Sequence, residues 1–244
     1  MQPIMFAFRP QSFVSPAYGN GDAALCPISF RSSVTHLACR RVNGASGVGK
    51  RMVDIVMAGV LLAVLAVPML VFGILIRLSS EGPALFRQQR IGLDGRRFVM
   101  LKFRTMRHAV ETAEGWRQAI RGDLRVTPIG AFLRRTSLDE LPQLLNVLMG
   151  SMSMVGPRPH APGTRAAGRP FEHVTDHYAA RHCVKPGMTG LAQVRGWRGE
   201  TDTEDKLLRR LASDMEYIAI RNVGIDLLIL CRTTVTVARM LNAY

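Results

Sequence analysis

The chain has 244 residues, enough for one large domain with a hydrophobic core, and a formal net charge of +14. Such a charge implies an anionic partner, which could be a nucleic acid, a membrane surface or a phosphorylated substrate. The sequence contains no zinc-finger spacing, RNA-binding aromatic strand or basic-zipper heptad, so a nucleic-acid partner is not expected. The four cysteines are widely spaced without a CxxC pair, which indicates neither a zinc site nor a disulfide framework.

The N-terminal region mixes proline, serine, glycine and arginine without a sustained period. Asp22 is its only acid, and Asn43-Gly44-Ala45-Ser46-Gly47 is typical of a flexible linker. The charged and apolar regions of a secretory signal are absent. We therefore expect residues 1–48 to be a mostly disordered, basic extension.

A long apolar run follows, because no charged side chain occurs from Ile55 to Ile76. At ~1.5 Å per residue, a straight helix of this length would be about 33 Å long, enough for the hydrocarbon core of a bilayer. The alternative is a buried helix of a soluble core. Apolar runs of this length favour the membrane interpretation.

Pro68 lies near the middle of this run, where it would break or kink a helix. Both flanks of the run are basic, so the positive-inside bias selects neither end for translocation. A re-entrant helix over residues 49–78, broken at Pro68 and entering and leaving by the cytoplasmic face, satisfies both observations. A normally spanning helix is the alternative.

Residues 84–92 and 97–104 alternate as two short strands around Asp94-Gly95, which predicts a β-hairpin. Residues 107–122 are predicted to be helical, and residues 123–130 a loop. The sequence then reaches the acidic pair Asp139-Glu140.

The acidic pair has a structural interpretation as well as a chemical one. Ser137 with Glu140 three residues later matches a capping box, and Asp139 would favour the helix dipole. Pro142 fits a helix that begins at Ser137 poorly, because it would remove a ladder bond. A short apolar helix is predicted from Leu141 to Leu148.

Two later segments could contact phosphate. Pro157 and Pro159 restrict the backbone on either side of Arg158, which would hold its guanidinium still for a bidentate contact. The glycine-rich segment 185–199 offers N–H groups, a hydroxyl and basic side chains that could surround a diphosphate. A proline-rich connector with a solvated arginine, and an ordinary turn, are the alternatives.

The C-terminal region predicts two amphipathic helices, from Thr203 to Ile220 and from Ile225 to Leu241. The second carries charges at Asp226, Arg232 and Arg239 and leaves a broad apolar face. It is too short and too charged for a good membrane span. It better suits a position on a core or at the bilayer interface.

Taken together, these segments resemble the bacterial sugar transferases that are monotopic polyprenyl-phosphate phosphoglycosyl transferases. The resemblance extends from Lys50 to Tyr244 and is closest to the undecaprenyl-phosphate glucose phosphotransferase branch. The motifs that carry it are Lys50-Arg51-Met52-Val53-Asp54, Lys102-Phe103-Arg104-Thr105-Met106, Arg134 with Ser137-Leu138-Asp139-Glu140-Leu141-Pro142-Gln143, Gly156-Pro157-Arg158-Pro159, and Pro186-Gly187-Met188-Thr189-Gly190.

The resemblance implies an α/β fold, mostly α with a small β-hairpin, in a monotopic membrane protein of the minimal catalytic form. Residues 79–244 would be the cytoplasmic catalytic domain, with amphipathic interfacial helices. The location would be the cytoplasmic face of the bacterial inner membrane, with both termini cytoplasmic. One departure concerns Val67, where the family often has a serine before the helix-breaking proline.

The activity implied is transfer of a hexose 1-phosphate from a UDP-sugar to undecaprenyl phosphate, which releases UMP and initiates exopolysaccharide or other glycan assembly. Glucose is the first candidate sugar and galactose the second. Asp139 would be the nucleophile that forms an aspartyl-phosphosugar, and Mg²⁺ would be held by Asp139 and Glu140. Glu140 could instead act on the acceptor phosphate. The candidates for phosphate binding are Arg134 and Arg158, followed by Lys102, Arg104, Lys185 and Thr189.

Anionic lipid is a further expected partner, and a homo-oligomer is possible. Two hypotheses that assign the chain to another class of protein compete with this one. A membrane scaffold could keep the fold without the chemistry, although the intact Asp139-Glu140 pair argues against it. A basic nucleic-acid-binding protein would show steeply salt-dependent binding instead.

Overall fold

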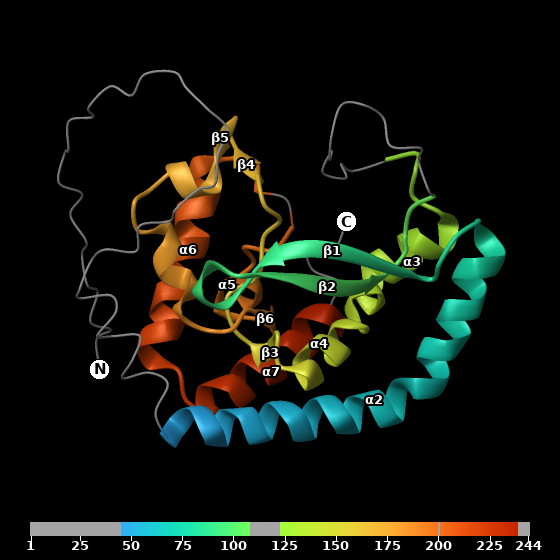
Figure 1. Cartoon of the computed structure of the whole chain (residues 1–244), viewed down its shortest axis with the longest axis horizontal. Helices are drawn as coiled ribbons and strands as arrows, with labels where there is room; N and C mark the ends of the chain where they lie inside the picture. Colours follow the sequence, from blue (N-terminus) through green and yellow to red (C-terminus); the bar gives the residue numbers. More distant parts are fainter. Residues whose placement is uncertain (1–44, 108–122, 200, 239–244) are drawn as a thin grey trace.

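The computed structural model describes residues 45–107, 123–199 and 201–238, which form a helix-rich molecule with small sheets (Figure 1). Its helices are α2 (Ala45–Ser79), α3 (Pro128–Thr136), α4 (Gln143–Met149), α5 (Leu191–Val194), α6 (Glu204–Ile220) and α7 (Val223–Ala238). Its strands are β1 (Leu85–Ile91), β2 (Arg97–Phe103), β3 (Ser153–Val155), β4 (Arg165–Ala166), β5 (Arg169–Pro170) and β6 (Gly187–Thr189). Short 3₁₀ turns occur at η1 (Leu93–Gly95), η2 (Leu138–Glu140), η3 (Phe171–His173) and η4 (Tyr178–Cys183).

The long helix α2 begins earlier than the sequence suggested and is not interrupted. Residues 45–47, expected in a flexible linker, form its first turn. Pro68 lies inside a continuous helix, so the expected break into two helices is wrong. Figure 1 shows instead that α2 bends sharply partway along its length. Proline accounts for a bend without a break, since it removes one ladder bond and crowds the preceding turn.

The two parts of α2 pack against different clusters of side chains. Before Pro68, Ala58 is fully buried in the main core with residues of α4, β3 and α7. After Pro68, Phe72 and Ile76 pack on a second cluster that contains Phe103 and Leu133. The bend therefore lets one helix follow two sides of the domain.

The outward face of α2 is apolar and uncovered. It is the one helix in the described part of the chain that is long and apolar enough to cross a membrane. Only 6% of its most apolar window is buried, which does not match the buried helix of a soluble core. Its exposed side chains include Val56, Val60, Val64, Val67, Leu70, Val71, Ile74 and Leu75. This surface is consistent with a monotopic membrane protein.

The predicted β-hairpin is confirmed. β1 and β2 pair antiparallel from Leu85↔Phe103 to Ile91↔Arg97, and Asp94 (φ 54°) and Gly95 (φ 72°) form the tight connection. Asn146 of α4 fixes the free edge of β2: its Oδ1 accepts from Leu101 N at 2.9 Å, and its Nδ2 donates to Val99 O at 2.7 Å. This side chain takes the place of a neighbouring strand and sets the position of Lys102, the next residue along.

The segment before the acidic pair differs from the prediction. Residues 128–130, expected in a loop, are the first turn of α3, with Pro128 at the favoured first helical position. Thr127 caps this helix by accepting from Gly130 N at 3.0 Å. A Cβ on Gly130 would lie 2.0 Å from the Thr105 carbonyl oxygen, so only glycine allows this approach. The predicted helix over 107–122 falls outside the described residues from position 108 onward.

Two C-terminal helices complete the domain as predicted. Thr203 caps α6 by accepting from Lys206 N at 3.3 Å, and α7 begins two residues before the predicted Ile225. The predicted end of α7 at residue 241 lies beyond the described residues. Its uncovered apolar side chains include Leu227, Leu228 and Val235.

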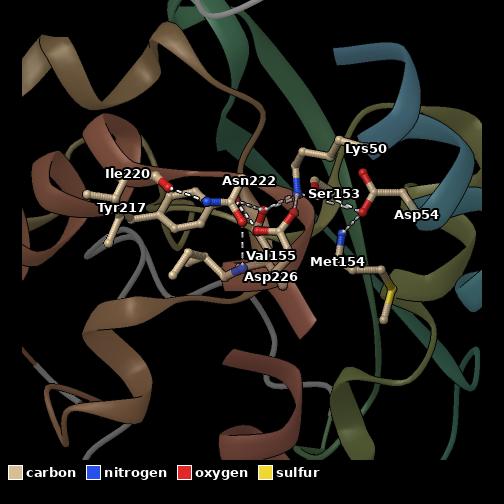
Figure 2. Close-up of polar contacts among 10 residues, drawn as sticks. Lys50, Asp54, Ser153, Met154, Val155, Tyr217, Ile220, Asn222 and Asp226 are labelled. Atoms are coloured by element: carbon tan, nitrogen blue, oxygen red, sulfur yellow. Dashed lines mark hydrogen bonds and ion pairs between the residues drawn. The ribbon is translucent and has the colours of Figure 1, made fainter. Parts of the chain in front are cut away.

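A buried polar junction joins α2 to β3, α6 and α7, and comprises Lys50, Asp54, Ser153, Tyr217 and Asp226 (Figure 2). Lys50 Nζ lies 2.6 Å from Asp226 Oδ2 and donates to Val155 O at 3.2 Å. The Tyr217 hydroxyl lies 2.7 Å from Asp226 Oδ1 and 3.0 Å from Val155 O. One lysine at the start of α2 thus ties that helix to α7 and β3.

The second half of the polar junction is built on Asp54, one turn after Lys50. Its Oδ1 accepts from Ser153 Oγ at 3.1 Å and from Met154 N at 3.0 Å. The adjacent Arg51 donates to Val147 O at 2.6 Å and Leu148 O at 2.8 Å, at the end of α4. Both contacts fix the first part of α2 to β3 and to the end of α4.

Candidate active site

The acidic pair lies in the 3₁₀ turn η2, between α3 and α4. The capping-box interpretation is wrong, because Ser137 makes no side-chain cap bond and has a left-handed backbone (φ 62°, ψ 14°). The helix begins only at Gln143, so Pro142 directly precedes it and removes no ladder bond. A left-handed serine costs of order 1 kcal/mol or more, which indicates a turn held by its surroundings.

Two cations from other elements converge on Glu140. The Lys102 ammonium on β2 donates to Glu140 Oε1 at 3.1 Å and lies 4.0 Å from Asp139 Oδ2. The Arg158 guanidinium donates to both Glu140 oxygens, with Nη1 at 3.2 Å from Oε2. This two-pronged pairing is the strong geometry of arginine with a carboxylate. The structure therefore brings together four of the predicted residues: Lys102, Asp139, Glu140 and Arg158.

The two neighbouring carboxyl groups have opposite pKa shifts. Burial raises the pKa of Asp139 to about 6; the positive charge of Lys102 opposes this shift and the negative charge of Glu140 adds to it. Burial also acts to raise the pKa of Glu140, but the charges of Arg158 and Lys102 hold that pKa well below its usual value. Arg158 and Lys102 thus favour the charged form of Glu140, whereas the charged form of Asp139 is less well stabilised.

Further arginines surround the pair. The charge of Arg134, on the last turn of α3, acts on the pKa of Asp139 in the lowering direction. Arg198 donates to Ser137 Oγ and is close enough to stabilise the ionised form of Glu140. Sequence reasoning did not single out Arg198. Its position in the glycine-rich segment 185–199 was the available signal.

Three other predicted phosphate contacts lie elsewhere in this structure. Arg104 is buried and donates to Ser80 O at 2.6 Å, where it holds the end of α2. Lys185 lies near Arg51 and Gly150 at the end of α4. The Thr189 hydroxyl lies 2.7 Å from that of Thr233 on α7. All three therefore face parts of the molecule other than the acidic pair.

The residues present fit a magnesium ion only together with substrate. No group of three or more His, Cys, Asp or Glu side chains that could hold a metal occurs within residues 45–107, 123–199 and 201–238. Mg²⁺ is commonly bound by one or two carboxylates plus substrate phosphates and water. Asp139 and Glu140 can supply that minimum, because Lys102 lies no closer than 4.0 Å to Asp139 Oδ2, and Glu140 Oε2 accepts one hydrogen bond, from Arg158, and keeps a second lone pair.

Known proteins that are similar to this chain indicate its family. A profile described as bacterial sugar transferase matches residues 45–240. The chain is similar to a UDP-glucose:undecaprenyl-phosphate glucose-1-phosphate transferase of Caulobacter vibrioides, with 49% identity over 195 residues, 80% of this chain and 72% of that protein. It is also similar to the exopolysaccharide production protein PSS of Rhizobium leguminosarum, with 47% identity over 187 residues, 77% of this chain and 94% of that protein.

A relative named for another sugar also matches. It is the UDP-N-acetylgalactosamine-undecaprenyl-phosphate N-acetylgalactosaminephosphotransferase of Aeromonas hydrophila, 38% identical over 189 residues, 77% of this chain and 43% of that protein. The chain spans less than half the length of several longer relatives that it matches. Because the profile covers most of the chain, the chain belongs to the bacterial sugar transferase family.

Proposed function

We propose that this chain transfers a sugar 1-phosphate from a UDP-sugar to undecaprenyl phosphate and releases UMP, a step that would initiate exopolysaccharide assembly. The proposal rests on the acidic pair Asp139-Glu140 and the cationic side chains around it. Lys102 and Arg158 bind Glu140, and the charges of Arg134 and Arg198 act on the pair. Such a surplus of positive charge around one weakly supported carboxylate suits attack on an anionic phosphate.

In the first step, an oxygen of the Asp139 carboxylate attacks the β-phosphorus of the UDP-sugar. The new bond joins that oxygen to phosphorus, and the bond from this phosphorus to the bridging oxygen breaks. UMP leaves with the bridging oxygen and its electron pair, and the sugar phosphate stays on Asp139 as an acyl-phosphate. Lys102 and Arg158 offset the charge that develops on the phosphoryl oxygens.

In the second step, a phosphate oxygen of undecaprenyl phosphate attacks the same phosphorus. The bond to Asp139 breaks, the carboxylate is restored, and the product is undecaprenyl-diphospho-sugar. Glu140 keeps Lys102 and Arg158 in place through both steps, because its carboxylate binds both cations. Mg²⁺ held by Asp139 and Glu140 would add Lewis-acid neutralisation of the diphosphate when bound.

The sugar is proposed from the names of the relatives. Glucose is the first candidate, because the Caulobacter vibrioides relative is named for UDP-glucose. N-acetylgalactosamine is the second, because the more distant Aeromonas hydrophila relative is named for it. A comparison of UDP-glucose, UDP-galactose and UDP-N-acetylgalactosamine as donors decides between these sugars.

The membrane arrangement is also a proposal. The bend of α2, its uncovered apolar face and the uncovered apolar residues of α7 suit a re-entrant helix and an interfacial helix at the cytoplasmic face of the inner membrane. The net charge of +14 would favour anionic lipid. Reporter tags at residues 1 and 244 should both remain cytoplasmic. A periplasmic tag at either end would show a spanning helix instead.

The activity is tested by UMP release from purified protein in detergent with a UDP-sugar, undecaprenyl phosphate and Mg²⁺. With UDP-sugar labelled in the β-phosphate and no acceptor, label should remain on the protein and should be absent in Asp139→Asn. Release of UMP only when acceptor is present, with no labelled protein, would contradict the aspartyl intermediate. No release with any UDP-sugar would contradict the function itself.

A further inference from the structure

The backbone around Arg158 is held by contacts from outside the segment. Pro157 and Pro159 have no N–H groups, so residues 157–160 cannot form a local ladder, and their carbonyls need other donors. Each one has a donor. Pro157 O accepts from Gly187 N at 3.0 Å, and His160 O from Ile91 N at 3.0 Å. Pro159 O accepts from the Arg90 guanidinium at 3.4 Å.

The remaining carbonyl, that of Arg158 itself, accepts from a buried side chain. Arg181 Nη2 donates to Arg158 O at 2.8 Å, and this contact spans 23 positions of sequence. Arg181 belongs to η4, and its side chain is 7% exposed. Unlike the two backbone donors, this one can be changed by substitution.

Arg181 is itself fixed by two buried groups. Its Nη2 lies 2.7 Å from Asp214 Oδ2 on α6, and its Nη1 donates to the Tyr178 hydroxyl at 2.6 Å. The Tyr178 hydroxyl in turn lies 3.1 Å from His160 Nδ1. A continuous set of polar contacts therefore runs from α6, through Arg181, to the backbone of the residue that binds Glu140.

We propose that Arg181 is a positioning residue for the reaction, which sets the place of the Arg158 guanidinium through the Arg158 carbonyl. The polar contacts of Arg181 are with Asp214, Tyr178 and the Arg158 carbonyl, so its connection to the acidic pair runs through Arg158. Misplacement of a charge-bearing group by about 1 Å can cost on the order of 10²-fold in rate. The inference rests on the proposed function only in its use of a UDP-sugar as substrate.

The test is a double-mutant cycle with Arg181→Lys and Arg158→Ala, read as kcat/KM for UMP release and as UDP affinity by calorimetry in detergent. Lysine keeps the charge beside Asp214, but one ammonium cannot reproduce the guanidinium fork that reaches Asp214, Tyr178 and the Arg158 carbonyl. We expect Arg181→Lys to lower kcat/KM about 10-fold to 100-fold and to weaken UDP binding. With Arg158→Ala already present, the same change should have less than about a 3-fold further effect.

Arg169→Lys is the matched control. Arg169 also pairs with a carboxylate of α6, Glu204, at 3.1 Å, and donates to a backbone carbonyl, that of His173, at 2.8 Å, but both contacts are exposed and neither involves Arg158. This change should alter kcat/KM by less than about 2-fold. An Arg181→Lys effect no larger than that of Arg169→Lys, or of equal size with and without Arg158, would overturn the proposal.

A second variant covers the case in which Arg181→Lys does not fold. Arg181→Met combined with Asp214→Leu removes both charges of the buried pair at similar volume, a kind of replacement that proteins often tolerate. The same cycle with Arg158→Ala then applies, with the same two outcomes. UDP affinity tests Arg181 even if no UMP release is found, so failure of the proposed function is distinguishable from failure of this inference.

Discussion

The polar junction and the acidic pair use the same ingredients in different ways. Each has two carboxylates with little exposure to solvent and a lysine. In the junction both carboxylates are hydrogen-bonded: Asp54 by Ser153 Oγ and Met154 N, and Asp226 by Lys50 and Tyr217 (Figure 2). At the site, Glu140 is bound as fully, but Lys102 lies 4.0 Å from Asp139 Oδ2, too far for a hydrogen bond.

The difference separates a structural cluster from a chemical one. Polar groups whose hydrogen bonds are all made hold elements together, here α2 against β3, α6 and α7. Burial destabilises the charged form of a carboxylate that has few close partners. This is why burial raises the pKa of Asp139 to about 6. Arg134, Arg158 and Arg198 also act on the two carboxylates, and this concentration of positive charge suits the binding of a diphosphate.

Among changes that distinguish the acidic pair from the polar junction, Asp139→Asn should have the largest effect on activity. UMP release should fall at least about 10³-fold, because an amide cannot attack phosphorus. The melting temperature in detergent should stay the same or rise, since the change removes a charge that burial disfavours. The exposed Asp205, changed to Asn, is the control and should affect neither quantity. A loss of activity that only follows a loss of stability would make Asp139 a structural residue like Asp226.

Glu140→Gln should have the next largest effect. It removes the charge that holds Lys102 and Arg158, so both cations lose their shared position. We expect kcat/KM to fall on the order of 10²-fold. Steady-state kinetics measures this fall in kcat/KM. The variant should elute from a size-exclusion column at the same volume as the unchanged protein, which shows that it is folded. Activity close to that of the unchanged protein would mean that Lys102 and Arg158 are positioned without Glu140.

Asp226→Asn tests the other cluster. Lys50 would lose its 2.6 Å partner while it stays mostly buried, and breaking a buried ion pair costs about 3 kcal/mol. Chemical denaturation in detergent should show this loss. The kcat of the folded fraction should change little, because Asp226 lies outside the acidic pair and the cations around it. A fall in kcat without a change in the free energy of unfolding would mean that the polar junction takes part in the reaction.

Much of this arrangement could be predicted from local sequence signals. The hairpin, the apolar helix and the amphipathic helix over residues 203–220 are local patterns, and the structure confirms them. Where the prediction was wrong, as at α3, only part of the cause is long-range packing. Thr127 followed by Pro128 is a local signal of a helix start that the loop prediction did not use, whereas the fit of Gly130 against Thr105 joins distant parts of the chain and has no local pattern.

The site was only half predictable for a similar reason. Lys102 and Arg104 are two residues apart and looked equivalent as phosphate contacts. β2 ends at Phe103, however, and Arg104 turns to the carbonyls at the end of α2 while Lys102 faces Glu140. A sequence gives the charge of a side chain but not the distant group that receives it. Arg198 was missed because its contact with Ser137 joins residues 61 positions apart.

The pH dependence of the free energy of unfolding should distinguish the acidic pair from the polar junction by a smaller effect. Burial raises the pKa of Asp139 from 3.8 to about 6, so the folded protein holds a proton more tightly than the unfolded chain does. The stabilisation is present below about pH 4 and is lost as the pH rises through about 6. Without divalent cations, the unfolding free energy should fall by on the order of 2 kcal/mol over this range, relative to Asp139→Asn. Parallel curves for the two proteins would contradict the raised pKa.

Tyr217→Phe should give the smallest effect and the most specific one. The change removes only a hydroxyl, which lies 2.7 Å from Asp226 Oδ1 and 3.0 Å from Val155 O in a residue that is 1% exposed. Asp226 keeps Lys50, so the charge stays paired and the loss should be about 1 to 2 kcal/mol, the value of one hydrogen bond to a charged group. In the Asp226→Asn background the same change should cost less, because the charged acceptor is already gone. Equal costs in both backgrounds would mean that Tyr217 stabilises the fold through its ring alone, and that the junction is less tightly connected than its contacts indicate.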